Sequence, residues 1–167
     1  AIVSGIGAPS RAHLTFGVLF FDYDLDGRQD LLTINGHVED EIAVVQPSQQ
    51  HAQPASLYWN AGPDAPATFV PVADRGALST PLVGRGGAYG DLDGDGDLDL
   101  LLVPTAGPVR LLRNDAPSAS WVRLKIVGTA SGHDAIGAAV EVEAGGVVHR
   151  RLVTPTHGYL SQSDPAI

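Results

Sequence analysis

The chain has 167 residues, a formal net charge of −9 and no cysteine. This length suits one domain of ordinary size or two small ones. The acidic balance disfavours nucleic acid as a partner, because phosphate binding needs a basic patch. The lack of cysteine excludes a disulfide framework and thiol chemistry.

The first predicted elements are two short strands that flank an acidic segment. Residues 16–21 and 31–34 are apolar runs bounded by turn residues, a pattern typical of buried strands. The acidic segment between them, residues 22–30, has a second copy at residues 91–99, which is followed by another apolar run at residues 100–103. We therefore expect each acidic segment to be a loop that joins two strands.

Both loops carry carboxylates at positions 1, 3, 5 and 9 and glycine at position 6. Calcium takes about six to eight oxygen ligands, and the glycine permits the sharp turn that folds a loop around the ion. Without a cation, like charges at this spacing would repel one another. We therefore predict two calcium sites rather than two solvated acidic turns, and two bound ions would change the net charge from −9 to −5. The side-chain positions are Asp22, Asp24, Asp26 and Asp30 in the first loop, and Asp91, Asp93, Asp95 and Asp99 in the second.

Other metal sites fit these loops less well. An EF-hand loop has a glutamate at position 12 and a helix on each side, whereas position 12 here is Thr33 or Leu102 and the flanks are typical of strands. Magnesium requires strict octahedral geometry and keeps several waters. Neither loop contains a histidine or cysteine that would favour a transition metal.

The two loops belong to a longer internal repeat. The loops and their flanking strands recur at an offset of 69 residues, while residues 57–60 recur at residues 111–114 with an offset of 54. The difference of 15 residues indicates an insertion in the first copy, which we place in a long surface loop at residues 39–54. Residues 68–73 form another strand candidate. Repeats of about 40–60 residues with about four strands each are typical of propeller blades, and two blades alone would be marginally stable.

The character of the sequence changes after residue 117. Residues 121–127 alternate in polarity, which predicts a half-buried strand, and residues 138–153 predict a β-hairpin with a Gly-Gly turn. We predict an all-β chain with propeller blades over residues 1–116 and a separate small β domain over residues 117–167.

The remaining polar and aromatic residues give no catalytic pattern. The sequence has no nucleophile elbow, phosphate loop or HExxH helix, and metal-bound carboxylates stay ionised and make poor general acids. We predict that the protein is not an enzyme. We expect His133 and Asp134 to form a loop pair rather than a catalytic dyad, and Trp59 and Trp121 to be packing anchors rather than a platform for sugar. Tyr159, Ser161 and Ser163 are expected to have ordinary packing roles rather than to form a recognition surface.

The sequence resembles two known families. Residues 20–30 and 90–99 are similar to FG-GAP/VCBS-type repeats, the calcium-carrying blades of integrin-like β-propellers. Residues 121–165, especially 134–138 and 158–165, resemble the ASPIC/UnbV domain. The combination resembles the C-terminal part of bacterial members of the cartilage acidic protein family.

The resemblance implies a partial integrin-like propeller of about two blades, with the eight aspartates as side-chain ligands. It also implies that Arg28 and Asp97, at position 7 of each loop, provide a backbone carbonyl to the ion. Two departures are notable: a full propeller needs more blades, and the family pattern would continue into another apolar strand after residue 167. We therefore expect the chain to be part of a longer protein.

The favoured function is a non-catalytic, calcium-binding module that mediates protein–protein interaction outside the cytoplasm. Extracellular calcium modules bind at about 10⁻⁴–10⁻³ M, which suits an extracellular, periplasmic or cell-surface location. No signal peptide or membrane-spanning run is predicted. Two alternatives stay open: a carbohydrate-binding module, and an accessory subunit of a larger exported or membrane-attached complex.

Overall fold

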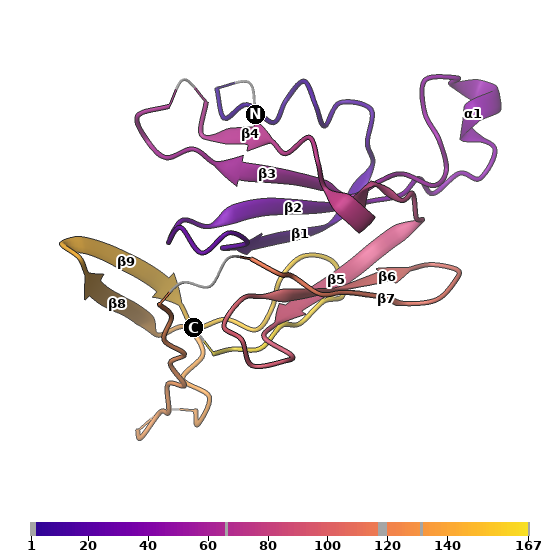
Figure 1. The fold of residues 1–167 in the computed structure, drawn as a ribbon. Helices are drawn as coiled ribbons and strands as arrows, with labels where there is room; N and C mark the ends of the chain where they lie inside the picture. The colour runs from indigo at the N-terminus through magenta and orange to yellow at the C-terminus, as the bar shows by residue number, and fades with distance from the viewer. Residues whose placement is uncertain (1–2, 66, 117–119, 131, 167) are drawn as a thin grey trace.

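The computed structural model describes residues 3–65, 67–116, 120–130 and 132–166. It is a mostly β structure with antiparallel sheets and almost no helix, as predicted (Figure 1). The three sheets have the strand orders β1-β2-β3-β4, β5-β6-β7 and β8-β9. The elements are β1 (Thr15–Phe21), β2 (Asp30–Asn35), α1 (Ile42–Val45), β3 (Ser56–Asn60), β4 (Phe69–Pro71), β5 (Gly84–Gly90), β6 (Asp99–Pro104), β7 (Arg110–Leu112), β8 (Ala139–Ala144) and β9 (Val147–Leu152), with a 3₁₀ turn at Gly76–Ser79.

The first two sheets repeat one another in register. Phe21 pairs with Asp30 across β1 and β2, and Gly90 pairs with Asp99 across β5 and β6. The first strand of each pair also has an irregularity at its start, between Thr15 and Gly17 and between Gly84 and Gly86. The offsets of 69 and 54 residues found in the sequence therefore correspond to equivalent positions in the fold.

The main core lies between these two sheets. Leu19 and Phe21 from β1 and Leu32 and Ile34 from β2 pack with residues of the second sheet, including Leu102. Period-2 alternation directs these side chains to one face of each strand. This shared core fixes the first strand of each sheet near that of the other and so positions both acidic loops at neighbouring strand ends.

The close approach of the two larger sheets explains why residue 87 of β5 is a glycine. A Cβ atom on Gly87 would lie 2.3 Å from Cδ1 of Ile34 and 2.9 Å from the carbonyl oxygen of Leu101. No side chain fits between those atoms. Glycine is therefore required here because a neighbouring side chain occupies the space, and not because of an unusual backbone angle.

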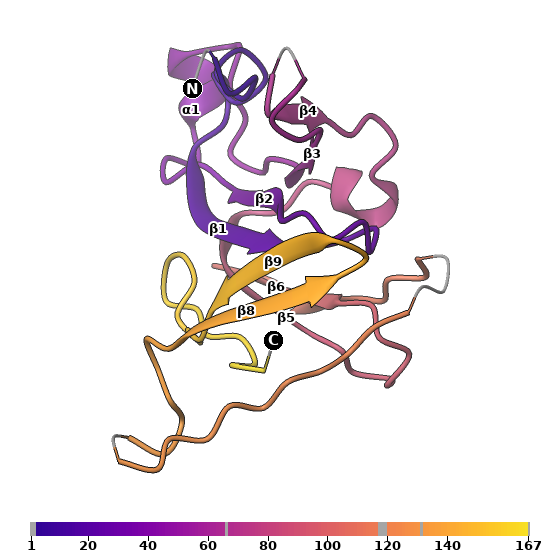
Figure 2. The ribbon, with the colours of Figure 1, turned by 90° about the vertical axis from the view of Figure 1, so that its left-hand side faces the viewer.

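The C-terminal hairpin forms as predicted and lies across one side of the two larger sheets (Figure 2). Its turn residues Gly145 and Gly146 have φ of +58° and +79°, which matches a tight two-residue hairpin turn. The strand predicted over residues 121–127 is wrong, because the part of the chain that the structure describes offers no strand that pairs with it. Trp121 instead lies against Gly96, and Arg123 pairs with Asp164.

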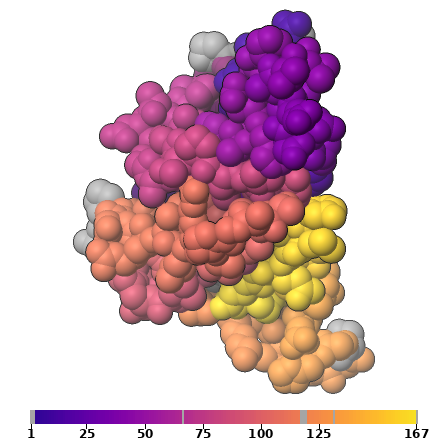
Figure 3. All heavy atoms as spheres, turned by 90° about the vertical axis from the view of Figure 1, so that its right-hand side faces the viewer, coloured from indigo at the N-terminus to yellow at the C-terminus, as the bar shows by residue number. Residues whose placement is uncertain are grey.

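The residues after β9 return to the inner strands of both larger sheets. Ser161 Oγ accepts a hydrogen bond of 3.0 Å from the backbone N–H of Gly87, and Ser163 Oγ accepts one of 3.1 Å from that of Tyr89. The ring of Tyr159 makes an edge contact with Phe16 of β1. In Figure 3 this segment is the yellow patch that adjoins both larger sheets. The packing role expected for Ser161 and Ser163 is confirmed, whereas Tyr159 packs against Phe16 and is 47% exposed.

The insertion of the first repeat is on the surface. It contains the single turn of α1, where Val44 and Val45 are largely exposed. The proposed division into domains after residue 116 stays a prediction, since residues 117–119 lie outside those that the structure describes.

Candidate metal centres

The first loop brings three of its aspartates together. One carboxylate oxygen each from Asp22, Asp24 and Asp30 lie within 4.8 Å of one another, a spacing that could hold a metal ion. Asp22 also shapes the loop, because its two oxygens accept hydrogen bonds of 3.0 and 2.7 Å from the N–H groups of Asp26 and Gly27. The loop is thereby wrapped around its first carboxylate.

Asp30, at position 9, joins the loop to the sheet. Its side chain is fully buried, and its two oxygens accept hydrogen bonds of 3.1 Å from the N–H of Tyr23 and 2.7 Å from that of Asn60. Burial raises the pKa of Asp30 to about 6 despite these two donors, and the nearby carboxylates of Asp24 and Asp26 add to the rise. A neighbouring cation would offset this cost of a buried negative charge.

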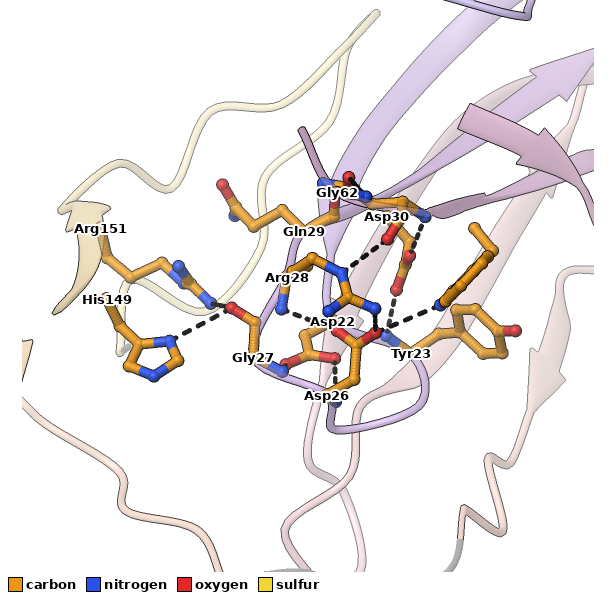
Figure 4. Close-up of polar contacts among 12 residues, drawn as sticks. Asp22, Tyr23, Asp26, Gly27, Arg28, Gln29, Asp30, Gly62, His149 and Arg151 are labelled. Atoms are coloured by element: carbon orange, nitrogen blue, oxygen red, sulfur yellow. Dashed lines mark hydrogen bonds and ion pairs between the residues drawn. The ribbon is translucent and has the colours of Figure 1, made fainter. Parts of the chain in front are cut away.

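Asp26, at position 5, is not part of the first triad. Its Oδ1 accepts a hydrogen bond of 2.8 Å from the N–H of Arg28, and its Oδ2 is paired with the Arg28 guanidinium (Figure 4). The indole N–H of Trp59 also donates to Oδ2 at 3.2 Å, and the guanidinium lies 5.3 Å from the centre of the Trp59 ring. Arg28 therefore holds the carboxylate that was predicted as a calcium ligand.

The second loop gathers a different triad. Oxygens of Asp91, Asp93 and Asp95 lie within 4.8 Å of one another. Asp99 is buried and accepts hydrogen bonds of 3.0 Å each from the N–H groups of Leu92 and Asn114, as Asp30 does in the first loop. Asp93 is exposed, and slight desolvation together with the charges of Asp95 and Asp99 raises its pKa.

Together the two triads cover all four predicted side-chain positions. The first contains positions 1, 3 and 9, and the second contains positions 1, 3 and 5. Because the two loops occupy equivalent places in the repeat, each triad is a subset of the same four-carboxylate arrangement. Whether the carbonyls of Arg28 and Asp97 complete the sets, as the resemblance implies, stays a prediction.

Two buried oxygens indicate that the residues fit a cation. Asp24 Oδ1 in the first loop is buried with no hydrogen-bond partner. Asp97, at position 7 of the second loop, is 3% exposed, and its Oδ1 is likewise without a partner while its Oδ2 accepts a hydrogen bond of 2.8 Å from the N–H of Ala116. A buried carboxylate oxygen without a partner is costly, and a hard cation held by the first triad would satisfy Asp24 Oδ1. Asp97 is not one of the carboxylates of the second triad.

Several contacts to the loops were not predicted from the sequence. The backbone of Asn60 and Asn114 anchors position 9 of each loop, and the matching Asn at offset 54 was the available signal. The C-terminal part of the chain also reaches both loops. Arg151 and His149 lie against the Gly27 carbonyl, a contact between residues more than 120 positions apart that no local pattern indicates.

Two other features were weighed in the sequence, a His133–Asp134 dyad and a Trp59 platform for sugar. His133 Nδ1 and Asp134 Oδ1 are 3.3 Å apart, and both side chains are largely exposed, as expected of a loop pair. One face of the Trp59 ring carries the Arg28 guanidinium.

The comparisons with known proteins identify the C-terminal part of the chain. A family model described as ASPIC and UnbV matches residues 128–167. The chain carries an ASPIC/UnbV domain at its C-terminus. The resemblance of this segment is thereby confirmed, whereas FG-GAP and VCBS repeats were not detected. No curated protein matches the sequence. Over the residues that the structure describes, no helix has the length and apolar character needed to cross a membrane.

Proposed function

We propose that this chain is a calcium-stabilised, non-catalytic β module that acts through protein–protein contact outside the cytoplasm. The observation that carries the calcium part is the matched pair of acidic loops. Both have carboxylates gathered within ligand distance of one another, and both have a buried carboxylate oxygen that lacks a hydrogen-bond donor. The same spacing of carboxylates at two equivalent places of a repeat favours two cation sites over two incidental acidic turns.

Calcium is the preferred ion in this proposal, because dense carboxylate loops with flexible geometry suit its larger coordination number better than magnesium. Its role is structural. The ion would offset repulsion among the aspartates and fix each loop between its two strands. At about 1 mM calcium and a Kd near 10⁻⁴ M, mass action adds about 1.4 kcal/mol of stability per ion.

The propeller architecture is part of the proposal. Two observations support it: the antiparallel strands of each larger sheet follow one another in sequence order, and the first strands, β1 and β5, lie next to each other. In a propeller, the first strand of each blade would face the central axis. The proposed location outside the cytoplasm rests on the acidic loops, because extracellular calcium modules bind at about 10⁻⁴–10⁻³ M, an affinity that would leave such sites empty in the cytosol.

An exposed apolar face supports the protein-contact part of the proposal. Leu101 and Val103 on β6 and Leu111 on β7 are 37%, 37% and 60% exposed, and Leu101 pairs with Leu111 across the two strands. On the opposite face of β6, Leu100 and Leu102 are buried against the first sheet. An apolar sheet face of this kind is typical of a surface that another β element or a partner protein covers. This observation also favours the alternative of an accessory subunit in a larger assembly.

Thermal unfolding in calcium, in magnesium and in chelator tests the proposal. We expect calcium to raise the midpoint more than magnesium does, and we expect the double variant Asp24→Asn/Asp93→Asn to lose this gain. Asp64→Asn, an exposed aspartate outside the loops, is the matched control and should keep it. Equal midpoints of the wild type in calcium and in chelator would contradict the proposal.

A further inference from the structure

The C-terminal part of the chain contacts both acidic loops at the same position. Position 6 is Gly27 in the first loop and Gly96 in the second, with φ of +87° and +97°. A Cβ atom on Gly27 would lie 2.5 Å from Cε1 of His149, and one on Gly96 would lie 2.1 Å from Cδ1 of Trp121. The residues that follow the second sheet are therefore packed directly against the backbone of the loops.

Hydrogen bonds fix the contact with the first loop. The Gly27 carbonyl accepts a hydrogen bond of 3.2 Å from the Arg151 guanidinium and lies 3.3 Å from Nδ1 of His149 (Figure 4). Both side chains lie on the half-buried face of β9, whereas Arg150 between them points to solvent and pairs with Glu141 at 2.6 Å. One face of the hairpin is thus directed at the loop.

The conformation of each loop decides whether these contacts can form. The N–H of Gly27 donates to Asp22 at 2.7 Å, so the carbonyl that Arg151 binds belongs to a residue that is held by a ligand carboxylate. In the second loop, Asp95 at position 5 accepts a hydrogen bond of 3.2 Å from the N–H of Asp97, across Gly96. Repulsion among the ionised aspartates opposes both closed arrangements, and a bound cation would remove that opposition.

We propose that calcium binding to the loops is coupled to the docking of Trp121 and of the β8–β9 hairpin, so that these C-terminal residues dock on the cation-bound loops. This inference rests on the proposed calcium sites. Coupling is reciprocal: if calcium favours docking, the docked hairpin raises calcium affinity by the same factor. The hairpin, the two inner strands and both loops line a cleft of about 700 Å³, so residues of the docked hairpin and of both loops share one space.

Calorimetric titration of calcium into the whole chain tests the reciprocal effect. The variant His149→Ala/Arg151→Ala should bind calcium about 10-fold more weakly at one of the two sites, within the usual range of coupling between sites. Arg150→Ala is the matched control on the same strand, and it should bind both ions as the wild type does.

Two further measurements keep the proposal falsifiable if the double variant folds poorly. Hydrogen exchange of the wild type should show that calcium protects β8 and β9 relative to chelator. In Trp59→Phe, where Trp121 is the single tryptophan, calcium should shift the fluorescence emission to shorter wavelength. Calcium binding without either change, and with equal affinity in the variants, would overturn the coupling alone. No calcium binding to the wild type would overturn the calcium sites as well.

Discussion

Replacing Asp30 by asparagine is expected to affect stability differently with and without calcium, because the variant should gain less from the ion. The Asp30 side chain is fully buried, and burial raises its pKa from 3.8 to about 6. At pH 7 without a cation the protein therefore holds a costly charge in its core. Asparagine has nearly the same shape, but it carries no charge and is a weak metal ligand by comparison.

The magnitude follows from two opposing effects. The difference between a pKa of about 6 and the ordinary 3.8 corresponds to at most about 3 kcal/mol of stability, which the variant would recover. The new NH₂ group would face one of the two backbone donors, from Tyr23 or Asn60, and lose a hydrogen bond worth about 1–2 kcal/mol. In chelator the variant should thus be as stable as the wild type or up to about 2 kcal/mol more stable. In about 1 mM calcium the wild type gains about 1.4 kcal/mol at this site and the variant does not.

Thermal unfolding measures this difference, since 1 kcal/mol corresponds to about 2–4 °C in a chain of this size. We expect the midpoint of Asp30→Asn to lie at or above that of the wild type in chelator, and we expect calcium to raise the wild-type midpoint by about 3–6 °C relative to that of the variant. A variant that is destabilised by the same amount in both conditions would refute the reasoning, because Asp30 would then act only through its hydrogen bonds.

The raised pKa of Asp30 also determines how the stability of the calcium-free protein changes with pH. The folded protein without calcium binds a proton at Asp30 more tightly than the unfolded chain does. Its stability should therefore rise as pH falls from about 7 through 6 and level off near 4, apart from contributions of other groups. The stabilisation by calcium should instead decrease as pH falls, because protonated carboxylates bind the ion poorly.

Three further predictions concern single contacts. Arg28→Ala should strengthen calcium binding at the first site several-fold in a calorimetric titration, because the side chain that pairs with Asp26 is removed while the backbone carbonyl is kept. Ser161→Ala should lower the free energy of unfolding by about 1–3 kcal/mol in urea, since the buried N–H of Gly87 loses its acceptor. Gly87→Ala should cost about 1–3 kcal/mol or more through overpacking in the same assay, whereas Gly90→Ala, with open space around its Cβ position, should be nearly neutral.

The local features of this chain could be predicted because they depend on residues close in sequence. The spacing of the aspartates indicated both loops, and the apolar runs beside them indicated the strands. The offset between Asn60 and Asn114 even corresponds to equivalent hydrogen bonds in the structure. The Gly145–Gly146 turn was predictable for the same reason, since two residues with positive φ are what a tight hairpin needs.

The features that depend on distant parts of the chain could not be predicted. The alternating polarity of residues 121–127 predicts a half-buried strand, but this pattern carries no information on whether a partner strand pairs with it. The pairing of Arg28 with Asp26 removes one expected ligand from the first triad, and spacing alone does not reveal this competition. The contact of Arg151 with Gly27 depends on the docking of the hairpin, for which the sequence offers no periodic signal.

The number of calcium ions bound per chain tests the central claim most directly. Calorimetric titration of the wild type should give two ions, one for each loop. Asp24→Asn and Asp93→Asn should each give one, and the double variant should give none, while Asp64→Asn should still give two. A wild type that binds no calcium, or a double variant that binds as many ions as the wild type, would contradict the account.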